Sequence, residues 1–338
     1  MPANLLMTGR DSGRDSSPAR WASKLRVMSV SHADPAITRW ARQFLREEPP
    51  RATSLLVTVF GDAIAPHGGA AWLRKLIELM DTFGINERAV RTSVFRLAED
   101  HWLEAQRHGR QSRYALTASG ARRFALASRR IYHPGPATWD GHWTLVLIPR
   151  GADVMASRSD LRRELGWEGF ATITPGLLAH PQADRDRLRE LLDELGVRDD
   201  AFVVGARDLP GVTTRGLAEL AGYWPLDAVA AQYREFLNRF GPVARAIGAD
   251  GAGCSPRQAF LVRTLLVHAY RRVVLHDPRL PAAMLPEDWP GREAYGLSRG
   301  VYRAVTPAAE GYLEAALTGA GEVLPMPSVE FRERFCAV

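Results

Sequence analysis

The deciding stretch of this sequence is Gly84-Ile85-Asn86-Glu87-Arg88-Ala89-Val90-Arg91-Thr92-Ser93-Val94-Phe95-Arg96-Leu97-Ala98-Glu99-Asp100. It predicts a short helix capped by Asn86, whose side-chain oxygen can accept a hydrogen bond from a backbone N–H of the first turn. At about 100° per residue, one face of the helix is apolar and consists of Val90, Val94, Leu97 and Ala98. Arginine and polar side chains occupy the remaining surface.

A small apolar face opposite an arginine face is typical of a recognition helix that enters the DNA major groove. The predicted DNA contacts from this helix are Arg88, Arg91, Thr92, Ser93 and Arg96. An ordinary solvated basic face is the alternative interpretation. Phe95 falls on the arginine side, and the sequence alone gives no reason for its position.

The segments before this helix predict a helix-turn-helix. Apolar side chains from Leu55 to Phe60 have helical spacing, and Gly61 and Pro66 are expected to limit that helix. A second amphipathic helix is expected from Trp72 to Met80, and residues 84–86 form a tight turn into the basic helix. Two helices joined by such a turn, the second one basic, make a helix-turn-helix.

A hairpin is predicted after the basic helix. Two short strands at residues 102–106 and 113–117 flank an arginine-rich tip that contains Gly109. Arg107, Arg110 and Arg113 are predicted to meet phosphates or a minor groove. Thr117 or Ser119 can cap a further helix that runs to about Tyr132. The whole segment 51–133 therefore predicts a winged-helix DNA-binding domain.

The charge distribution supports a polyanionic partner. The chain has 338 residues and a net charge of +6. Residues 86–131 contain ten arginines and four acidic side chains, so this one segment accounts for the whole excess. Such concentrated positive charge favours nucleic acid as the partner.

Composition excludes several other classes of protein. No apolar run reaches about 18 residues and the start has no apolar core of a secretory signal, so we expect no membrane span and a cytoplasmic location. The two cysteines, Cys254 and Cys336, make a disulfide framework or a cysteine zinc site unexpected. The nine histidines show no metal-binding spacing, so no metal and no cofactor are expected. The motif Gly296-Leu297-Ser298-Arg299-Gly300 matches a nucleophile elbow only by chance, because its flanks are not strand and helix.

The remaining chain predicts an arm and two further domains. Residues 1–50 have weak periodicity and are interpreted as a flexible arm, and Pro134-Gly135-Pro136 is interpreted as a linker. Residues 139–210 predict the element order βαββαβ of a ferredoxin-like sandwich. Residues 220–320 are expected to form an all-helical domain for effector binding and dimerisation. The overall fold class is therefore α+β.

Several segments resemble the PaaX family of transcriptional regulators. In the winged helix these are residues 91–97, 109–114 and 130–132. The middle domain contributes Trp139-Asp140-Gly141-His142-Trp143-Thr144. The carboxy-terminal part contributes residues 263–281 and Leu285-Pro286-Glu287-Asp288-Trp289-Pro290-Gly291. The resemblance extends from about Arg51 to about Ala320.

This resemblance implies a repressor that responds to an aryl-CoA thioester, with phenylacetyl-CoA as the named inducer of the family. We therefore expect a homodimer that binds double-stranded operator DNA and releases it when the acyl-CoA binds. The residues predicted to bind the effector are Trp224, Arg263, His268, Arg271 and Arg272. In the alternative interpretation, these arginines pair with Asp277 and Glu287 and tie the C-terminal helices together.

Two other functions remain open from the sequence. The chain could bind DNA without a small-molecule effector, or it could be a nucleic-acid-processing enzyme that uses the ferredoxin-like domain. The second is disfavoured because the middle domain shows no carboxylate pair at its strand ends for metal ions. No catalytic residue is predicted, and the protein is expected not to be an enzyme.

Overall fold

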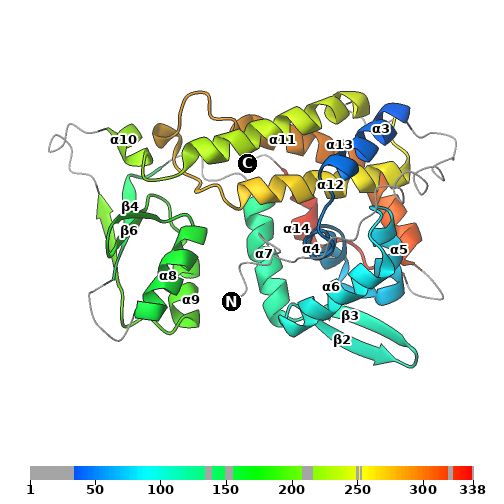
Figure 1. Cartoon of the computed structure of the whole chain (residues 1–338), viewed down its shortest axis with the longest axis horizontal. Helices are drawn as coiled ribbons and strands as arrows, with labels where there is room; N and C mark the ends of the chain where they lie inside the picture. Colours follow the sequence, from blue (N-terminus) through cyan, green and yellow to red (C-terminus); the bar gives the residue numbers. More distant parts are fainter. Residues whose placement is uncertain are drawn as a thin grey trace. The chain divides into compact units, whose positions relative to one another are not determined.

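The computed structural model describes residues 34–133, 139–148, 155–207, 216–248, 251, 253–318 and 323–336. Residues 1–33 of the predicted arm and the predicted linker at residues 134–136 lie outside the described residues. The chain divides into two compact units (Figure 1). The first comprises residues 1–133, 235–272 and 293–338, and the second comprises residues 134–234 and 273–292. Helices combine with two small antiparallel sheets, which confirms the predicted α+β class.

The amino-terminal part of the first unit joins helices to a three-stranded sheet with the order β1-β3-β2. Its elements are α3 (Pro35–Glu47), α4 (Ala52–Val59), the π-helical η2 (Phe60–Ile64), the 3-10 helix η3 (Ala65–His67), β1 (Ala70–Trp72), α5 (Leu73–Asp81), α6 (Glu87–Glu99), β2 (Leu103–His108), β3 (Gln111–Leu116) and α7 (Ala118–Tyr132). Thr117 caps α7 as predicted, because its hydroxyl oxygen accepts the N–H of Gly120 at 2.9 Å.

Two boundaries in this part differ from the prediction. Trp72 does not begin the second helix, because its backbone is extended and pairs with Arg113 of β3. Gly61 does not end the first helix, since the chain continues through a π turn to Ile64. The first error comes from pairing with a strand distant in sequence, which a helical spacing cannot reveal.

The interpretation of residues 1–50 as a flexible arm is wrong for α3. Asp34 caps this helix, and its side chain accepts the N–H of Ala36. The buried face of α3 packs on α11 (Leu226–Ile247), where Phe240 lies 5.3 Å from Trp40 and 5.6 Å from Phe44 between ring centroids. The indole of Trp40 also donates to the carbonyl of Arg239 at 2.9 Å. The helix is therefore part of the first unit.

The second unit contains the predicted βαββαβ order. Its elements are β4 (His142–Leu147), α8 (Met155–Trp167), β5 (Ala171–Thr174), β6 (Leu177–His180), α9 (Arg185–Glu194) and β7 (Phe202–Arg207). The strands form one antiparallel sheet in the order β5-β6-β4-β7, which is the arrangement of a ferredoxin-like sandwich. Asp184 caps α9 as predicted, by accepting the N–H groups of Asp186 and Arg187.

Alternation along the strands of this sheet produces two apolar layers. Val146 of β4 and Leu178 of β6 face a core completed by α8 and α9, where Leu165 and Leu191 are buried. On the other face, Trp143 packs in a cluster formed by the short helix α10 (Leu217–Ala221) and by the following segments. That cluster contains Ala171, Ala179, Trp224, Leu226, Leu280 and Met284.

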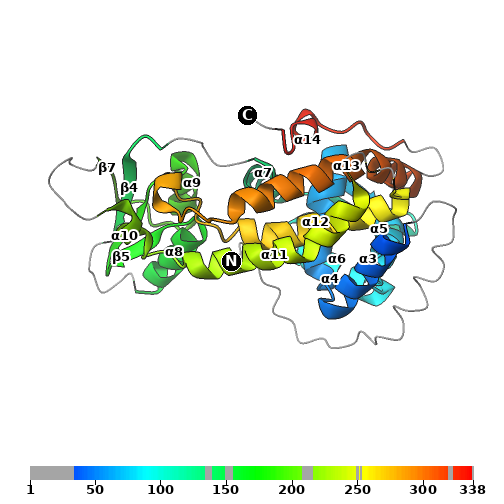
Figure 2. The same ribbon diagram turned by 90° about the horizontal axis from the view of Figure 1, so that it is seen from above.

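Every regular element described after residue 216 is helical. Besides α10 and α11 these are α12 (Pro256–Val274), the 3-10 helix η5 (Ala282–Met284), α13 (Gly291–Leu317) and α14 (Val329–Arg332). In the first unit, α11, α12 and α13 lie alongside one another (Figure 2). None of the described helices is both long enough and apolar enough to cross a bilayer.

Candidate nucleic-acid interface

Helix α6 begins where the sequence predicted. Gly84 has a φ of +72°, a conformation that glycine adopts without strain, and it turns the chain out of α5. Asn86 then caps α6, because its side-chain oxygen accepts the N–H of Ala89 at 2.8 Å. The apolar face is also confirmed, since Val90, Val94 and Leu97 are buried.

Ser93 lies on the buried side of α6, which is a correction to its place among the predicted DNA contacts. It is only 3% exposed, and its hydroxyl oxygen accepts a hydrogen bond from Thr53 of α4 at 2.9 Å. The pair joins α4 to α6 in the interior. Ser93 therefore positions the helix and has no surface with which to reach a ligand.

The opposite face of α6 is exposed and presents Arg88, Arg91, Thr92, Phe95 and Arg96. Arg91 pairs with Glu87 at 2.7 Å, with more than half of each side chain open to solvent. Such an i,i+4 surface pair is worth only about 0.3–0.5 kcal/mol, so a phosphate can replace the carboxylate. Phe95 is 62% exposed, although a phenyl ring usually lies inside a protein. It lies among the exposed arginines of this face.

The hairpin that follows α6 has a shorter tip than predicted. Strands β2 and β3 extend to His108 and Gln111, so Gly109 and Arg110 form the turn, with a φ of +61° at Gly109. Arg107 and Arg110 are exposed, whereas Arg113 is half-buried in the middle strand. Arg110 is thus the best placed of the three to meet a backbone phosphate.

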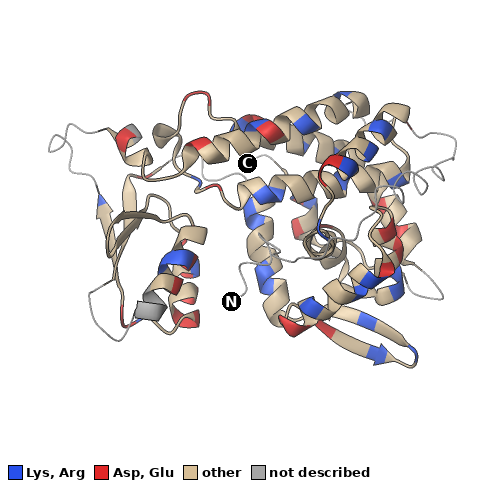
Figure 3. Cartoon of the chain, viewed as in Figure 1, with Lys and Arg blue, Asp and Glu red and all other residues tan. Residues whose placement is uncertain are grey.

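Figure 3 marks lysine and arginine positions along the ribbon, among them several on α6, the β2–β3 hairpin and α7. On α7, Arg122 and Arg129 are exposed. Arg123 instead covers the ring of Trp102 at 5.1 Å and donates to the carbonyl of Asp100. These elements all belong to the first unit, so the predicted accumulation of positive charge is present on one folded module.

The predicted effector residues all have partners within the protein. Arg263 is fully buried, with its Nε 3.0 Å from Asp62 and its Nη1 2.6 Å from Glu310. Arg272 is exposed and pairs with Glu48, while the indole of Trp224, in the second unit, donates to the carbonyl of Gly169. The alternative pairing of Arg263 with Asp277 or Glu287 is also wrong, because its carboxylate partners are Asp62 and Glu310.

His268 and Arg271 share a partner, Thr58 of α4. Arg271 Nε donates to the Thr58 hydroxyl oxygen at 2.9 Å, and Nδ1 of His268 lies 3.0 Å from the same oxygen. Burial, reinforced by the charges of Arg271 and Arg272, holds the pKa of His268 well below its usual value. The imidazole is therefore neutral at physiological pH.

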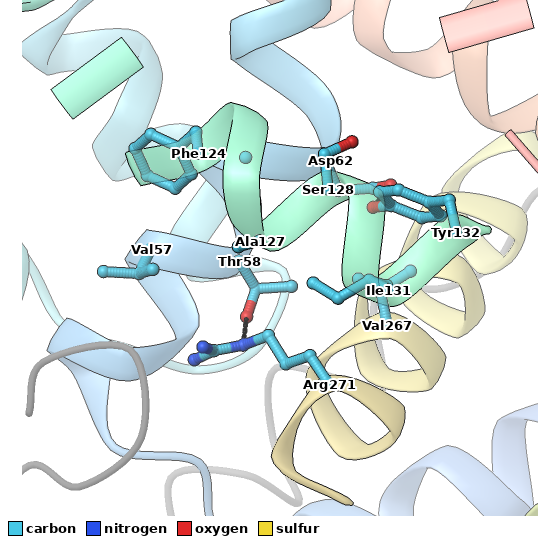
Figure 4. A pocket seen from close by; sticks show the side chains of 11 residues that line it. Val57, Thr58, Asp62, Phe124, Ala127, Ser128, Ile131, Tyr132, Val267 and Arg271 are labelled. Carbon is cyan, nitrogen blue, oxygen red and sulfur yellow. Dashed lines mark hydrogen bonds between the residues drawn. The ribbon is translucent and has the colours of Figure 1, made fainter. Parts of the chain in front are cut away.

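Arg271 borders a cavity between α4, α7 and α12 (Figure 4). The cavity measures about 20 Å³ and is lined mainly by apolar side chains such as Val57, Phe124 and Ile131. This space holds about one water molecule and is far too small for an acyl-CoA. Of the five predicted residues, only Arg271 lines this cavity.

The sequence analysis missed a buried network around Asp62, which is 1% exposed. Its Oδ1 accepts hydrogen bonds from the hydroxyls of Tyr132 (2.7 Å) and Tyr302 (2.9 Å) and from Arg334 Nη1 (3.2 Å). Arg263 approaches the other carboxylate oxygen. An aspartate within an otherwise apolar helical segment was the available signal, because a buried charge requires partners.

Neither a metal site nor a nucleophile elbow is found in the described residues. No three of their His, Cys, Asp and Glu side chains lie where they could hold a metal ion. The Gly-x-Ser-x-Gly match lies inside α13, and Ser298 is buried with its hydroxyl donating to the carbonyl of Ala294. The interpretation of this motif as a chance match is confirmed.

Family models match the chain over three segments. They are described as PaaX-like protein (residues 51–120), PaaX protein central Cas2-like domain (136–218) and PaaX-like protein C-terminal domain (224–315). A relative, the transcriptional repressor PaaX of Escherichia coli (strain K12), is 36% identical over 290 residues, or 85% of this chain and 90% of the relative. The uncharacterized protein Rv0674 from Mycobacterium tuberculosis matches in structure with a TM-score of 0.48 and 23% identity, over 79% of this chain and 99% of that one.

Replacing Arg263 by methionine should lower the free energy of unfolding by about 3–5 kcal/mol, because Asp62 loses a partner charge in the interior. Replacing Arg272 by methionine should cost at most about 1 kcal/mol, since its pair with Glu48 is exposed to solvent. Urea unfolding of the full chain, followed by circular dichroism, measures both changes. Equal losses would contradict a structural role specific to Arg263.

Proposed function

The chain belongs to the PaaX family of transcriptional regulators, and from that premise we propose that it represses an operon for phenylacetate catabolism by binding operator DNA. One observation carries the proposal: the arginines of α6 lie on an exposed face, while its apolar side chains anchor it. A relative is named as a transcriptional repressor, which supports repression over activation.

In this proposal α4, α5, α6 and the β2–β3 hairpin act as a winged helix. Helix α6 has 13 residues and is about 20 Å long. The major groove, about 12 Å wide, admits a helix of about 10–12 Å diameter. Arg88, Arg91 and Arg96 reach base edges or phosphates. Arg107 and Arg110 of the hairpin contact phosphates of the DNA backbone next to this groove. Arg113 lies further from the hairpin turn.

The proposed DNA complex contains a homodimer. Two copies of α6 about 34–36 Å apart enter successive major grooves on one side of the duplex, which requires a palindromic site. The effector is an aryl-CoA thioester such as phenylacetyl-CoA. It releases the operator by favouring a dimer geometry that misplaces the two helices, a coupling of typically about 1–3 kcal/mol. The protein acts as a regulator in the cytoplasm and not as an enzyme.

Selection of duplexes from a random DNA library with the full chain tests this function. The selected sites should contain two inverted half-sites one helical turn apart, and they should outcompete random DNA in a titration monitored by fluorescence anisotropy. Enrichment of no common sequence would contradict a sequence-specific regulator.

Replacing Arg91 by alanine should weaken binding to the selected duplex about tenfold, since an arginine contact to a base or phosphate is lost. The fold should persist, because the side chain is exposed and only pairs with Glu87. Arg46→Ala, an exposed arginine on α3, is the matched control for the loss of one charge. Equal effects of the two substitutions would remove α6 from the interface.

Replacing Arg110 by alanine should reduce the slope of log affinity against log salt concentration by about 0.9 for each bound copy of the chain, the value for one phosphate contact, and therefore by about 1.8 for the proposed dimer. The reason is its position at the exposed turn of the hairpin. Titrations at four or more salt concentrations give the slope. An unaltered slope would show that the hairpin tip makes no phosphate contact.

Phe95 should read a thymine methyl group, since it is the apolar side chain on the exposed face of α6. Replacing one thymine in one half-site by deoxyuridine should weaken wild-type binding about fourfold, the worth of one buried methyl group. The same replacement should have no effect on Phe95→Ala. A scan of deoxyuridine through the selected site measures the difference. Equal penalties in both proteins at every position would refute the contact.

A further inference from the structure

Helices α11 and α13 run alongside α12 in the first unit (Figure 2). Residues of α11 and α13 border an open groove of about 740 Å³. Its polar lining consists of Arg245 of α11 and Arg299 and Arg303 of α13. Three glycines, Gly248, Gly296 and Gly300, contribute backbone to the wall, and aliphatic side chains complete it. The lining contains no acidic side chain. Its volume lies within the range of about 300–1,000 Å³ that small-molecule sites occupy.

The three guanidinium groups are available to a ligand. Arg245 and Arg303 are exposed, and Arg299 is half-buried. Within the described residues, no ion pair or hydrogen bond engages any of the three side chains, in contrast to the buried Arg263 and its two carboxylates. Guanidinium groups present paired N–H donors in a fixed plane that matches the oxygens of a phosphate. The groove therefore has the charge and the donors of an anion site.

The glycines of α13 give the groove its depth. Gly296 and Gly300 lie one turn apart inside a long helix, where glycine is the least favourable residue after proline. A Cβ added at either position would meet nothing within 4 Å, so tight helix packing does not require glycine there. What the glycines leave is open space beside the arginine row of Arg299 and Arg303, into which a ligand can approach the helix backbone.

We propose that this groove binds the phosphate groups of the effector, the diphosphate and ribose phosphate of an aryl-CoA. The assignment rests on the proposed function in taking the ligand to be an aryl-CoA thioester. The guanidinium groups bind the phosphates, and the aliphatic part of the groove accommodates the pantetheine chain. This site is distinct from the five residues predicted from the sequence, whose side chains are engaged within the protein.

A short series of contacts connects the groove with the DNA-facing helix. Tyr302, next to Arg303 on α13, donates to Asp62 at 2.9 Å. Asp62 lies in the π turn that continues α4, and Thr53 at the start of α4 donates to Ser93 of α6. A ligand that shifts α13 thus acts on the same network that positions α6.

Isothermal titration calorimetry of the full chain with phenylacetyl-CoA tests the site. The variant Arg299→Gln/Arg303→Gln should bind about tenfold to a hundredfold more weakly, the effect of losing charge-assisted hydrogen bonds. The matched control is Arg292→Gln, an exposed arginine of α13 outside the groove, which should bind within twofold of wild type. Titration with free CoA should show the same loss, since CoA carries the phosphates without the acyl group.

A second variant separates binding from folding. Gly296→Ala/Gly300→Ala should raise the thermal unfolding midpoint, because alanine favours a helix and its methyl group meets no neighbour. The same variant should weaken phenylacetyl-CoA binding several-fold by filling the groove. A stabilised variant with unchanged affinity would overturn the proposed approach to the helix backbone.

Each remaining outcome has a defined meaning. If wild type binds phenylacetyl-CoA and the arginine variant binds it equally well, the groove assignment fails while the proposed repressor function stands. If wild type binds neither phenylacetyl-CoA nor free CoA, the proposed effector fails and the groove assignment with it. The arginine variant is also titrated with the selected duplex in the absence of phenylacetyl-CoA. If its affinity for the duplex falls by as large a factor as its affinity for phenylacetyl-CoA, the groove contacts DNA and the proposal is overturned.

Discussion

A single buried carboxylate, Asp62, holds the first unit together. It accepts hydrogen bonds from the hydroxyls of Tyr132 of α7 and Tyr302 of α13, and it pairs with the guanidinium groups of Arg263 of α12 and Arg334 after α14. Because a charge in the interior is costly without partners, these helices have to meet at one point. The network therefore specifies how the C-terminal helices of the first unit fit around the amino-terminal ones.

The same network divides the arginines of the molecule into two groups. Arg263 and Arg334 are buried and neutralised by Asp62, so they contribute structure and no ligand binding. Arg88, Arg96 and Arg110 are exposed on one module. Arg88 and Arg96 lie on the exposed face of a helix whose apolar face is buried, and Arg110 lies at the exposed turn of the hairpin. This division, more than the total charge of the chain, supports a regulator that binds DNA.

Local patterns in the sequence were sufficient to predict much of the fold. The cap at Asn86, the spacing of Val90, Val94 and Leu97, and the element order of the ferredoxin-like unit all depend on neighbours in sequence. Features set by distant segments could not be predicted. Arg263 was assigned to an effector site because nothing near it in sequence indicates Asp62. Ser93 was assigned to DNA because its partner Thr53 lies on another helix. Helix α3 was missed because its helical spacing of Ile37, Ala41 and Phe44 lies beside a long polar segment.

Amide hydrogen exchange of the full chain, with and without a selected duplex, tests the central claim most directly. If the exposed arginines of α6 and the hairpin form the interface, exchange should slow in peptides that cover residues 87–99 and 103–116. Peptides from the four-stranded sheet of the second unit should be unaffected. Protection confined to that sheet, with α6 exchanging at the same rate in both samples, would contradict the account.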